Sequence, residues 1–246
     1  MGLVINPRGT SGAGKTWLVR EVMAAYRWAG SAPTPVMRRG RSRPIAWRLE
    51  HPFGGRTLCV IGDYQGPKGG TDTIPLTDGG LDEAFRMACS EAEEGRDVLL
   101  EGYQLSGEHD RTVALANAQR LRGRALHVFC LDIPLHRCVQ NVVRRRRAGQ
   151  AIRPTIEQTA AAGHAALERA CFALGQSGVS CEWLDPAAAL YRASLLLGLR
   201  STSIPADRSR CLAPSRALSD GEQAEPGPRG AGSIRELALG QIPGCH

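Results

Sequence analysis

The sequence predicts a mixed α/β domain in which helices cover both faces of a mostly parallel sheet. Short apolar runs alternate with longer segments of helical periodicity through about the first 200 residues. Alternation of this kind is typical of strands that are joined by crossover helices and therefore lie parallel. A glycine-rich loop, Gly9–Thr16, gives a second indication, because it interrupts the chain where the first strand turns into the first helix.

The expected elements follow from the spacing of the apolar residues. Short runs predict strands at Leu3–Asn6, Ile45–Leu49, Thr57–Ile61, Asp97–Leu100, Ala125–Leu131 and Val179–Leu184. Apolar residues at helical spacing predict helices at Thr16–Ala29, Leu81–Glu94, Pro134–Arg147, Thr155–Gly175 and Pro186–Leu199. The turn-forming segment Pro52–Gly55 makes the second and third strands an expected hairpin.

Residues 1–200 are expected to form one folded domain. After about residue 200 the sequence is rich in Ser, Pro, Gly, Arg and Asp, and it has no sustained periodicity. We expect residues 201–246 to be a disordered or loosely packed tail, with Ser233–Leu239 able to form one short helix. The chain has no run of 18 apolar residues and opens without a basic leader. These features predict a cytoplasmic protein with no membrane partner, and they leave the oligomeric state open.

The chain is basic, with a formal net charge of +7, and its bases are nearly all arginine. A surplus of this size is compatible with a polyanionic partner such as nucleic acid. Arginine-biased codon usage explains the same composition without such a partner. The arginines of Ser31–Arg43 are accordingly either a DNA contact or a solvated loop.

Eight cysteines are spread along the chain, and no two of them form a C-x-x-C pair. Several lie inside apolar runs, as Cys59 and Cys130 do. We expect them to be small core residues in a reducing compartment. Their spacing predicts no zinc site.

The glycine-rich loop matches the phosphate-binding pattern G-x-x-x-x-G-K-[ST] at every position. Its glycines allow backbone N–H groups to turn toward phosphate oxygens, and the following helix N-terminus adds partial positive charge. We expect Lys15 to reach the β- and γ-phosphates of ATP and the Thr16 hydroxyl to bind Mg²⁺. The expected nucleotide-binding residues are Gly9, Thr10, Ser11, Gly12, Ala13, Gly14, Lys15 and Thr16.

A P-loop of this kind serves kinases, GTPases and motor ATPases alike. The chain has no N-K-x-D guanine motif, and it is shorter than a motor domain. A phosphotransferase is therefore the favoured class. The predicted architecture is a three-layer P-loop kinase fold with a small arginine-rich lid.

Two further features fit a kinase. The strand Asp97–Leu100 ends at Glu101, where a carboxylate can hold Mg²⁺ or orient the acceptor, although an ordinary strand-to-loop acid is the alternative. The helix Pro134–Arg147 ends in four arginines, of which Arg144 and Arg145 are the expected pair that closes over ATP. Four successive arginines cannot all face one site, because helical positions are about 100° apart. A solvated basic helix end is the alternative.

The segment Val60–Ile74 is the most distinctive in the chain. Asp63 follows an apolar strand, where several small P-loop kinases carry the acid that takes a proton from the attacking hydroxyl. We expect Tyr64 to stack on a base, and Asp72 and Thr73 to bind a polar acceptor. A purely structural turn is the alternative for this segment.

Taken together, these motifs resemble the bacteriophage P-loop kinases that act on 5-hydroxymethyluracil in DNA. The resemblance covers about residues 3–150, and Gly-Asp-Tyr followed by Gly-Gly-Thr-Asp-Thr is its discriminating part. It implies transfer of the ATP γ-phosphate to the hydroxymethyl group of 5-hydroxymethyldeoxyuridine in DNA. It also implies a step in thymidine hypermodification, which protects phage DNA from host nucleases and takes place in the host cytoplasm.

Two other functions are compatible with the same phosphate-binding residues. One is a kinase of a free nucleoside, nucleotide or other small metabolite. The other belongs to a different class, a non-catalytic nucleotide switch or a DNA-binding ATPase.

Overall fold

A computed structural model of the chain describes residues 2–27, 32–66, 69–102 and 108–199. All of these belong to one compact unit, Met1–Thr202. Among them, no helix has the length and apolar character to cross a bilayer. The tail expected at residues 201–246, with its short helix, lies outside the described residues and stays a prediction.

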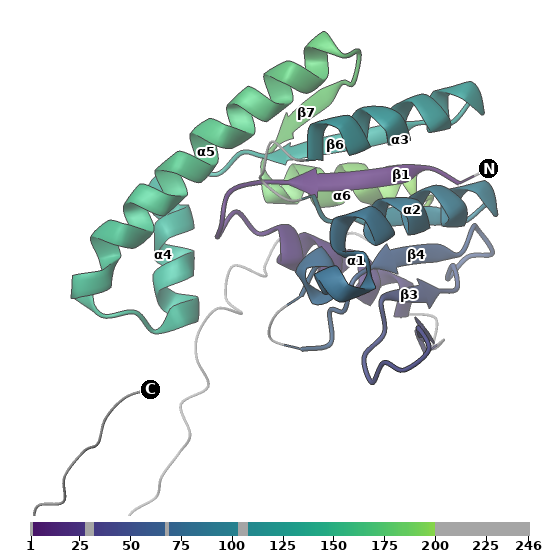
Figure 1. Cartoon of the computed structure of the whole chain (residues 1–246), viewed down its shortest axis with the longest axis horizontal. Helices are drawn as coiled ribbons and strands as arrows, with labels where there is room; N and C mark the ends of the chain where they lie inside the picture. Colours follow the sequence, from purple (N-terminus) through teal and green to yellow (C-terminus); the bar gives the residue numbers. More distant parts are fainter. Residues whose placement is uncertain (1, 28–31, 67–68, 103–107, 200–246) are drawn as a thin grey trace, which may run out of the picture. The chain divides into compact units, whose positions relative to one another are not determined.

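The described residues form a seven-stranded sheet in the order β2-β3-β4-β5-β1-β6-β7 (Figure 1). β4, β5, β1, β6 and β7 pair in parallel, whereas β2 and β3 add an antiparallel edge. The predicted α/β sheet is therefore confirmed, and so is the hairpin between β3 and β4. The strands are β1 (Val4–Arg8), β2 (Thr34–Val36), β3 (Ala46–Leu49), β4 (Leu58–Ile61), β5 (Asp97–Leu100), β6 (Leu126–Leu131) and β7 (Cys181–Leu184).

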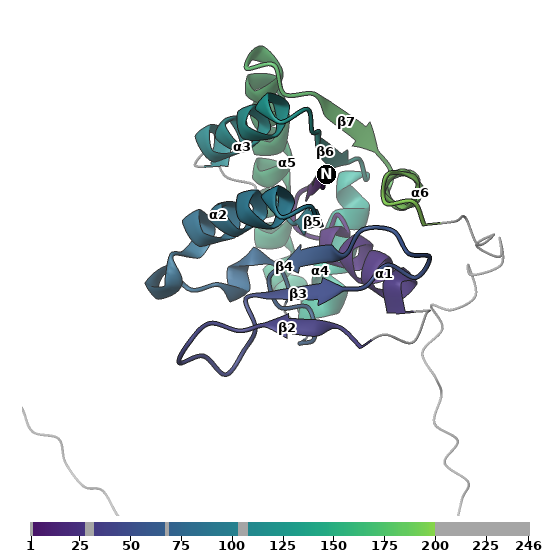
Figure 2. The same ribbon diagram turned by 90° about the vertical axis from the view of Figure 1, so that its right-hand side faces the viewer.

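Helices cover both faces of this sheet (Figure 2). α1 and α6 pack on one face, in a hydrophobic cluster with Ile5, Leu99 and Phe129. α2, α3 and α5 pack on the other face, against Val98 and Cys130. The helices are α1 (Lys15–Arg27), α2 (Gly80–Glu93), α3 (His109–Leu121), α4 (Leu135–Arg146), α5 (Arg153–Gln176) and α6 (Pro186–Leu196), with short 3₁₀ turns η1 (Thr71–Thr73), η2 (Leu76–Asp78) and η4 (Gln150–Ile152).

The two covered faces explain why the interior strands read as continuous apolar runs. Neighbouring residues of a strand point to opposite faces, so Val4 packs with α2 while Ile5 packs with α1. Both side chains are fully buried. A strand that is buried on both faces has no polar alternation, as is usual in parallel sheets.

Two elements of the structure, β2 and α3, are not predicted from the sequence pattern. β2 is an exposed edge strand inside the basic segment that reads as a series of turns. α3 has a weak apolar pattern, because two of its four buried positions are the polar residues Thr112 and Gln119. Edge exposure and buried polar side chains both weaken the periodicity from which elements are predicted.

A buried polar network joins β1, β5 and α3. The Asn6 side chain donates from Nδ2 to the Leu100 carbonyl at 2.6 Å. The Arg8 guanidinium donates to Asn6 Oδ1 at 2.8 Å and to Thr112 Oγ1 at 2.6 Å. It also lies 3.3 Å from the carboxylate of Glu108, and both charged side chains are buried. Because buried charges are costly unless they are paired, the network holds these three elements in one arrangement.

Candidate functional site

The Gly9–Thr16 loop connects β1 to α1 at the carboxyl end of an interior strand. Gly12 and Gly14 have φ values of 87° and 94°, in the left-handed region that favours glycine. The Ala13 N–H donates to the Thr10 carbonyl at 3.1 Å and closes the turn. The loop therefore leads directly onto a helix N-terminus, which carries partial positive charge.

The same loop lies against the backbone of α4. A Cβ atom at Gly12 would come within 2.2 Å of the Cys138 carbonyl oxygen, so this approach requires glycine. Asn141 Nδ2 donates to the Gly12 carbonyl at 3.0 Å. Arg145 Nη2 donates to Ser11 Oγ at 3.3 Å. α4 thus brings one arginine of its basic end to the loop.

Of the two arginines predicted to form the lid, Arg145 is the one that bonds to the Gly9–Thr16 loop. Arg144 occupies the neighbouring helical position, about 100° away around the axis, and both residues are exposed. Arg147 ends the helix in the left-handed conformation, with a φ of 51°. The tertiary structure therefore distinguishes arginines that the sequence run presents as equivalent.

The Lys15 ammonium group is confined within the loop. Its Nζ donates to the Gly9 carbonyl at 2.7 Å and to the Thr10 carbonyl at 3.4 Å. Burial lowers the pKa of Lys15, while the carboxylates of Glu101 and Asp72 act in the opposite direction. A cation in this position attracts an anionic ligand such as a phosphate.

Glu101 follows β5 and meets Thr16 at the start of α1. Thr16 Oγ1 lies 3.4 Å from each carboxylate oxygen of Glu101. The Tyr64 hydroxyl donates to Glu101 Oε2 at 3.0 Å. Burial raises the pKa of Glu101, and the Lys15 charge and the Tyr64 hydrogen bond counteract this increase. A hydroxyl and a carboxylate side by side are hard oxygen ligands of the kind that Mg²⁺ prefers.

Tyr64 lies in the core and not on the surface. Its side chain is 4% exposed and packs in the hydrophobic cluster of α1. This burial does not support the predicted stacking of Tyr64 on a base, which stays a prediction. Its hydroxyl instead orients the carboxylate of Glu101.

Asp63 and Thr73 close the loop that follows β4. The Asp63 N–H donates to Thr73 Oγ1 at 2.8 Å, and that hydroxyl donates to the Gly70 carbonyl at 2.7 Å. The buried Asp63 carboxylate accepts from the Gln65 N–H at 3.0 Å. The predicted roles of Asp63 as a base and of Thr73 as an acceptor contact stay predictions, and both side chains already hold the loop together.

Asp72 is the acid of this loop that faces Lys15 and Glu101. It lies in η1, its side chain is exposed, and it interacts electrostatically with both of those residues. Desolvation raises the pKa of Asp72, and the Lys15 charge acts against this increase. The structure therefore brings together three of the predicted site residues: a cation, a partly buried carboxylate and an exposed carboxylate.

Two arginines of the basic segment reach the same loop. Arg41 Nη2 donates to the Thr73 carbonyl at 3.0 Å, and its Nη1 lies 3.0 Å from Asp78 Oδ2. Arg38 contacts the Asp78 carbonyl and lies 3.9 Å from the Glu83 carboxylate. Because these contacts join distant parts of the chain, no short-range pattern predicts that the basic segment lies beside the loop of Asp72.

No protein-family model matches the chain. The chain is similar to a protein named 5-hmdU DNA kinase from Pseudomonas phage PaMx11. The two sequences are 35% identical over 153 residues, which is 62% of this chain and 74% of the relative.

The burial of Glu101 leads to a prediction about stability. Because burial raises its pKa, the ionised carboxylate destabilises the fold near neutral pH, and Glu101→Gln removes this cost while keeping the Tyr64 hydrogen bond. We expect a gain of about 1 kcal/mol, or about 2–4 °C in melting temperature at pH 7.5. The gain should shrink as the pH falls through the raised pKa of Glu101, since the wild-type carboxyl then becomes neutral. Glu21→Gln on α1 is the control, and a lower melting temperature for Glu101→Gln would contradict the prediction.

Proposed function

The chain belongs to the family of 5-hmdU DNA kinases, and we propose that it transfers the γ-phosphoryl group of ATP to 5-hydroxymethyldeoxyuridine in DNA. The bond from the γ-phosphorus to the β–γ bridging oxygen breaks, and a bond to the hydroxymethyl oxygen forms. ADP leaves, and a base takes the hydroxyl proton. The proposal depends above all on one observation, the convergence of Lys15, Glu101 and Asp72 at the Gly9–Thr16 loop.

The donor side of this proposal is the Gly9–Thr16 loop, acting as a P-loop. Its two glycines with positive φ allow the close backbone approach that a triphosphate needs. Lys15 donates to two loop carbonyls and would exchange these for β- and γ-phosphate oxygens. The N-terminus of α1 adds favourable partial charge.

Thr16 and Glu101 are the residues that would hold Mg²⁺. Their oxygens are hard ligands at a separation of 3.4 Å, which is compatible with neighbouring positions around one small cation. When bound, the ion neutralises charge on the β- and γ-phosphates. Tyr64 contributes by fixing the orientation of the Glu101 carboxylate.

We assign the base to Asp72, with Asp63 as a positioning residue. Asp72 is exposed and close enough to Lys15 and Glu101 to interact with both charges. Asp63 is buried, and its carboxylate accepts a hydrogen bond from the Gln65 backbone. A base must reach the hydroxyl proton, and exposure favours Asp72 for this task.

We assign the lid to the segment formed by α4, η4 and α5, with Arg145 as its active arginine. Arg145 already contacts Ser11 in the loop, and its charge acts on Lys15. A planar guanidinium suits the oxygens of a transferring phosphoryl group. The neighbouring arginines at positions 144, 146 and 147 remain on exposed faces, where they can contact a polyanion.

We expect the basic segment 38–43 to be part of the DNA-binding surface. Arg41 bonds the loop that carries Asp72, so the segment lies next to the proposed base. Arg39 and Arg43 are exposed there, and the chain as a whole is basic. Arginines at this position would bind the phosphate backbone around the target nucleotide. The hydroxymethyl group would reach ATP after the base leaves the stack.

The phosphorylated base would then be an activated intermediate for further thymidine hypermodification, and the modified DNA would resist host nucleases. Two rival functions share the phosphate-binding residues. A small-molecule kinase would act on free nucleosides or nucleotides, and a DNA-binding ATPase or nucleotide switch would phosphorylate no acceptor. The acceptor of the labelled phosphate distinguishes all three.

One assay tests the proposal. The protein is incubated with Mg²⁺ and ATP labelled at the γ-phosphate, together with DNA containing 5-hydroxymethyluracil, matched thymine DNA and free nucleosides. We expect label only in the first DNA, and a loss of about 10²–10³-fold in kcat for Lys15→Ala. Label on free nucleosides would support the small-molecule kinase, and ATP hydrolysis without a labelled acceptor would support the ATPase. Undiminished transfer by Lys15→Ala would overturn the whole assignment.

The two acids are separated by Asp72→Asn and Asp63→Asn. Loss of the base should lower kcat for Asp72→Asn by about 10²–10⁴-fold with little change in melting temperature. Asp63→Asn should reduce kcat less and change the melting temperature little, because the amide oxygen can still accept the hydrogen bond from the Gln65 N–H. A larger loss of kcat for Asp63→Asn than for Asp72→Asn would indicate that Asp63 is the base.

The lid arginine is tested by Arg145→Ala, with Arg146→Ala as the matched control one position further along α4. We expect kcat to fall by about 10²-fold for Arg145→Ala, because one donor to the transferring group is lost. Arg146→Ala should change mainly the salt dependence of DNA binding. Equal kcat values for the two variants would remove Arg145 from the lid.

A further inference from the structure

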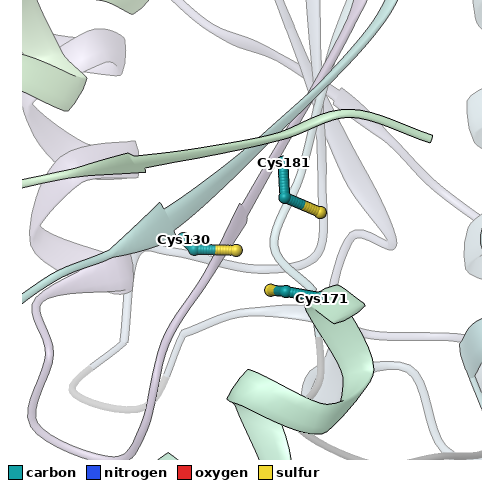
Figure 3. A group of neighbouring side chains, drawn as sticks. All are labelled: Cys130, Cys171 and Cys181. Carbon is teal, nitrogen blue, oxygen red and sulfur yellow. The ribbon is translucent and has the colours of Figure 1, made fainter. Parts of the chain in front are cut away.

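Three cysteines from three different elements converge between the sheet and α5. β6 and β7 are parallel neighbours in which Val128 lies opposite Cys181. Alternate residues of a strand share a face, so Cys130 and Cys181 point to the same side. α5 packs on that side, and Figure 3 shows Cys171 pointing toward the other two.

The spacing of the three thiols fits a single metal ion. Their Sγ atoms all lie within 4.8 Å of one another. A Zn–S bond is about 2.3 Å long, so the sulfur ligands of one zinc ion are about 4 Å apart. The approach of the side chains therefore needs only small rotations, with no movement of the strands or the helix.

We propose that Cys130, Cys171 and Cys181 form a binding site for one thiophilic metal ion, of which Zn²⁺ is the physiological representative. Sulfur ligands select ions such as Zn²⁺ and Cu⁺ over Mg²⁺ and Ca²⁺, which prefer oxygen. Binding of Zn²⁺ releases the three thiol protons and leaves a complex of charge −1. Three thiolates leave a fourth position that water can occupy.

The surroundings suit such a complex. Cys130 and Cys171 are buried, whereas Cys181 is partly exposed on the edge strand β7. An ion can therefore reach the site from solvent on the side of Cys181. The guanidinium of Arg8, which is also paired with Glu108, is close enough to act electrostatically on Cys171 and Cys181. The walls are apolar and include Val128, Leu167, Leu174 and Val179.

The ion would act as a structural link between α5 and the sheet. The other end of α5 packs on α4 through Ile156 and Ala160. The Ala160 carbonyl also accepts a hydrogen bond from Thr10 Oγ1 in the phosphate-binding loop, at 3.1 Å. An ion at Cys171 would therefore fasten the helix that supports both the loop and α4. Cysteine spacing alone predicts no zinc site, because each ligand comes from a different element.

The test uses the full chain with Cys211→Ser and Cys245→Ser, reduced and freed of metal by a chelator. Cd²⁺ is the probe, because its bonds to thiolates give a charge-transfer absorption band. We expect the band to saturate at one ion per chain. Zn²⁺ added alone to the metal-free chain should raise its melting temperature, since it binds the folded state more tightly than the unfolded chain.

The variant Cys171→Ala/Cys181→Ala should lose both the band and the Zn²⁺-dependent rise in melting temperature. Cys59→Ala, which removes a buried thiol on β4, should keep both. A melting curve in chelator establishes that each variant is folded. Should the double variant be unfolded, Cys181→Ala alone must reduce the band.

Three outcomes would overturn the metal site. These are the absence of a saturable band in the parent chain, an undiminished band in the double variant, and an unchanged band in the folded single variant. None of these measurements depends on phosphoryl transfer, so their failure is distinguishable from failure of the proposed kinase function.

Discussion

The hydrogen bond from Asn6 to the Leu100 carbonyl, with the paired Arg8 beside it, is the constraint on which the site depends. It fixes the carboxyl ends of β1 and β5 relative to each other inside the protein. The Gly9–Thr16 loop continues β1, and Glu101 continues β5. The 3.4 Å separation of Thr16 and Glu101 is therefore a consequence of the sheet rather than of a flexible loop.

A second constraint acts on the loop after β4. Gly62 and Gly70 both have positive φ, and a Cβ atom on Gly62 would lie 2.4 Å from the Gly70 carbonyl oxygen. The chain can fold back on itself here because glycine permits both the conformation and the contact. Asp63 bridges to Gly70 and so closes the loop, which leaves Asp72 as its outward-facing acid.

The third support comes from α4 and α5, which hold the Gly9–Thr16 loop from its other side. Gly12 lies against the backbone of α4, and Thr10 bonds to α5. The two helices in turn pack on each other through a small apolar cluster. A loop that is held between a sheet and a helix pair would lose little entropy on binding a ligand, as in a preorganised site. The cysteine cluster lies where α5 meets the sheet and would strengthen this support.

The sequence by itself determined the α/β alternation, the Gly9–Thr16 loop and the position of Glu101 at the end of a strand, because these depend on local backbone preferences and periodicity. It also contained the pattern behind the family assignment. Only the tertiary structure distinguished the members of each candidate set. Asp63 is buried whereas Asp72 is exposed, and Arg145 is the candidate lid arginine that bonds to Ser11. The tertiary structure likewise buried Tyr64 and joined three cysteines from separate elements. Such partners are set by packing between distant segments, and a one-dimensional pattern carries no record of that packing.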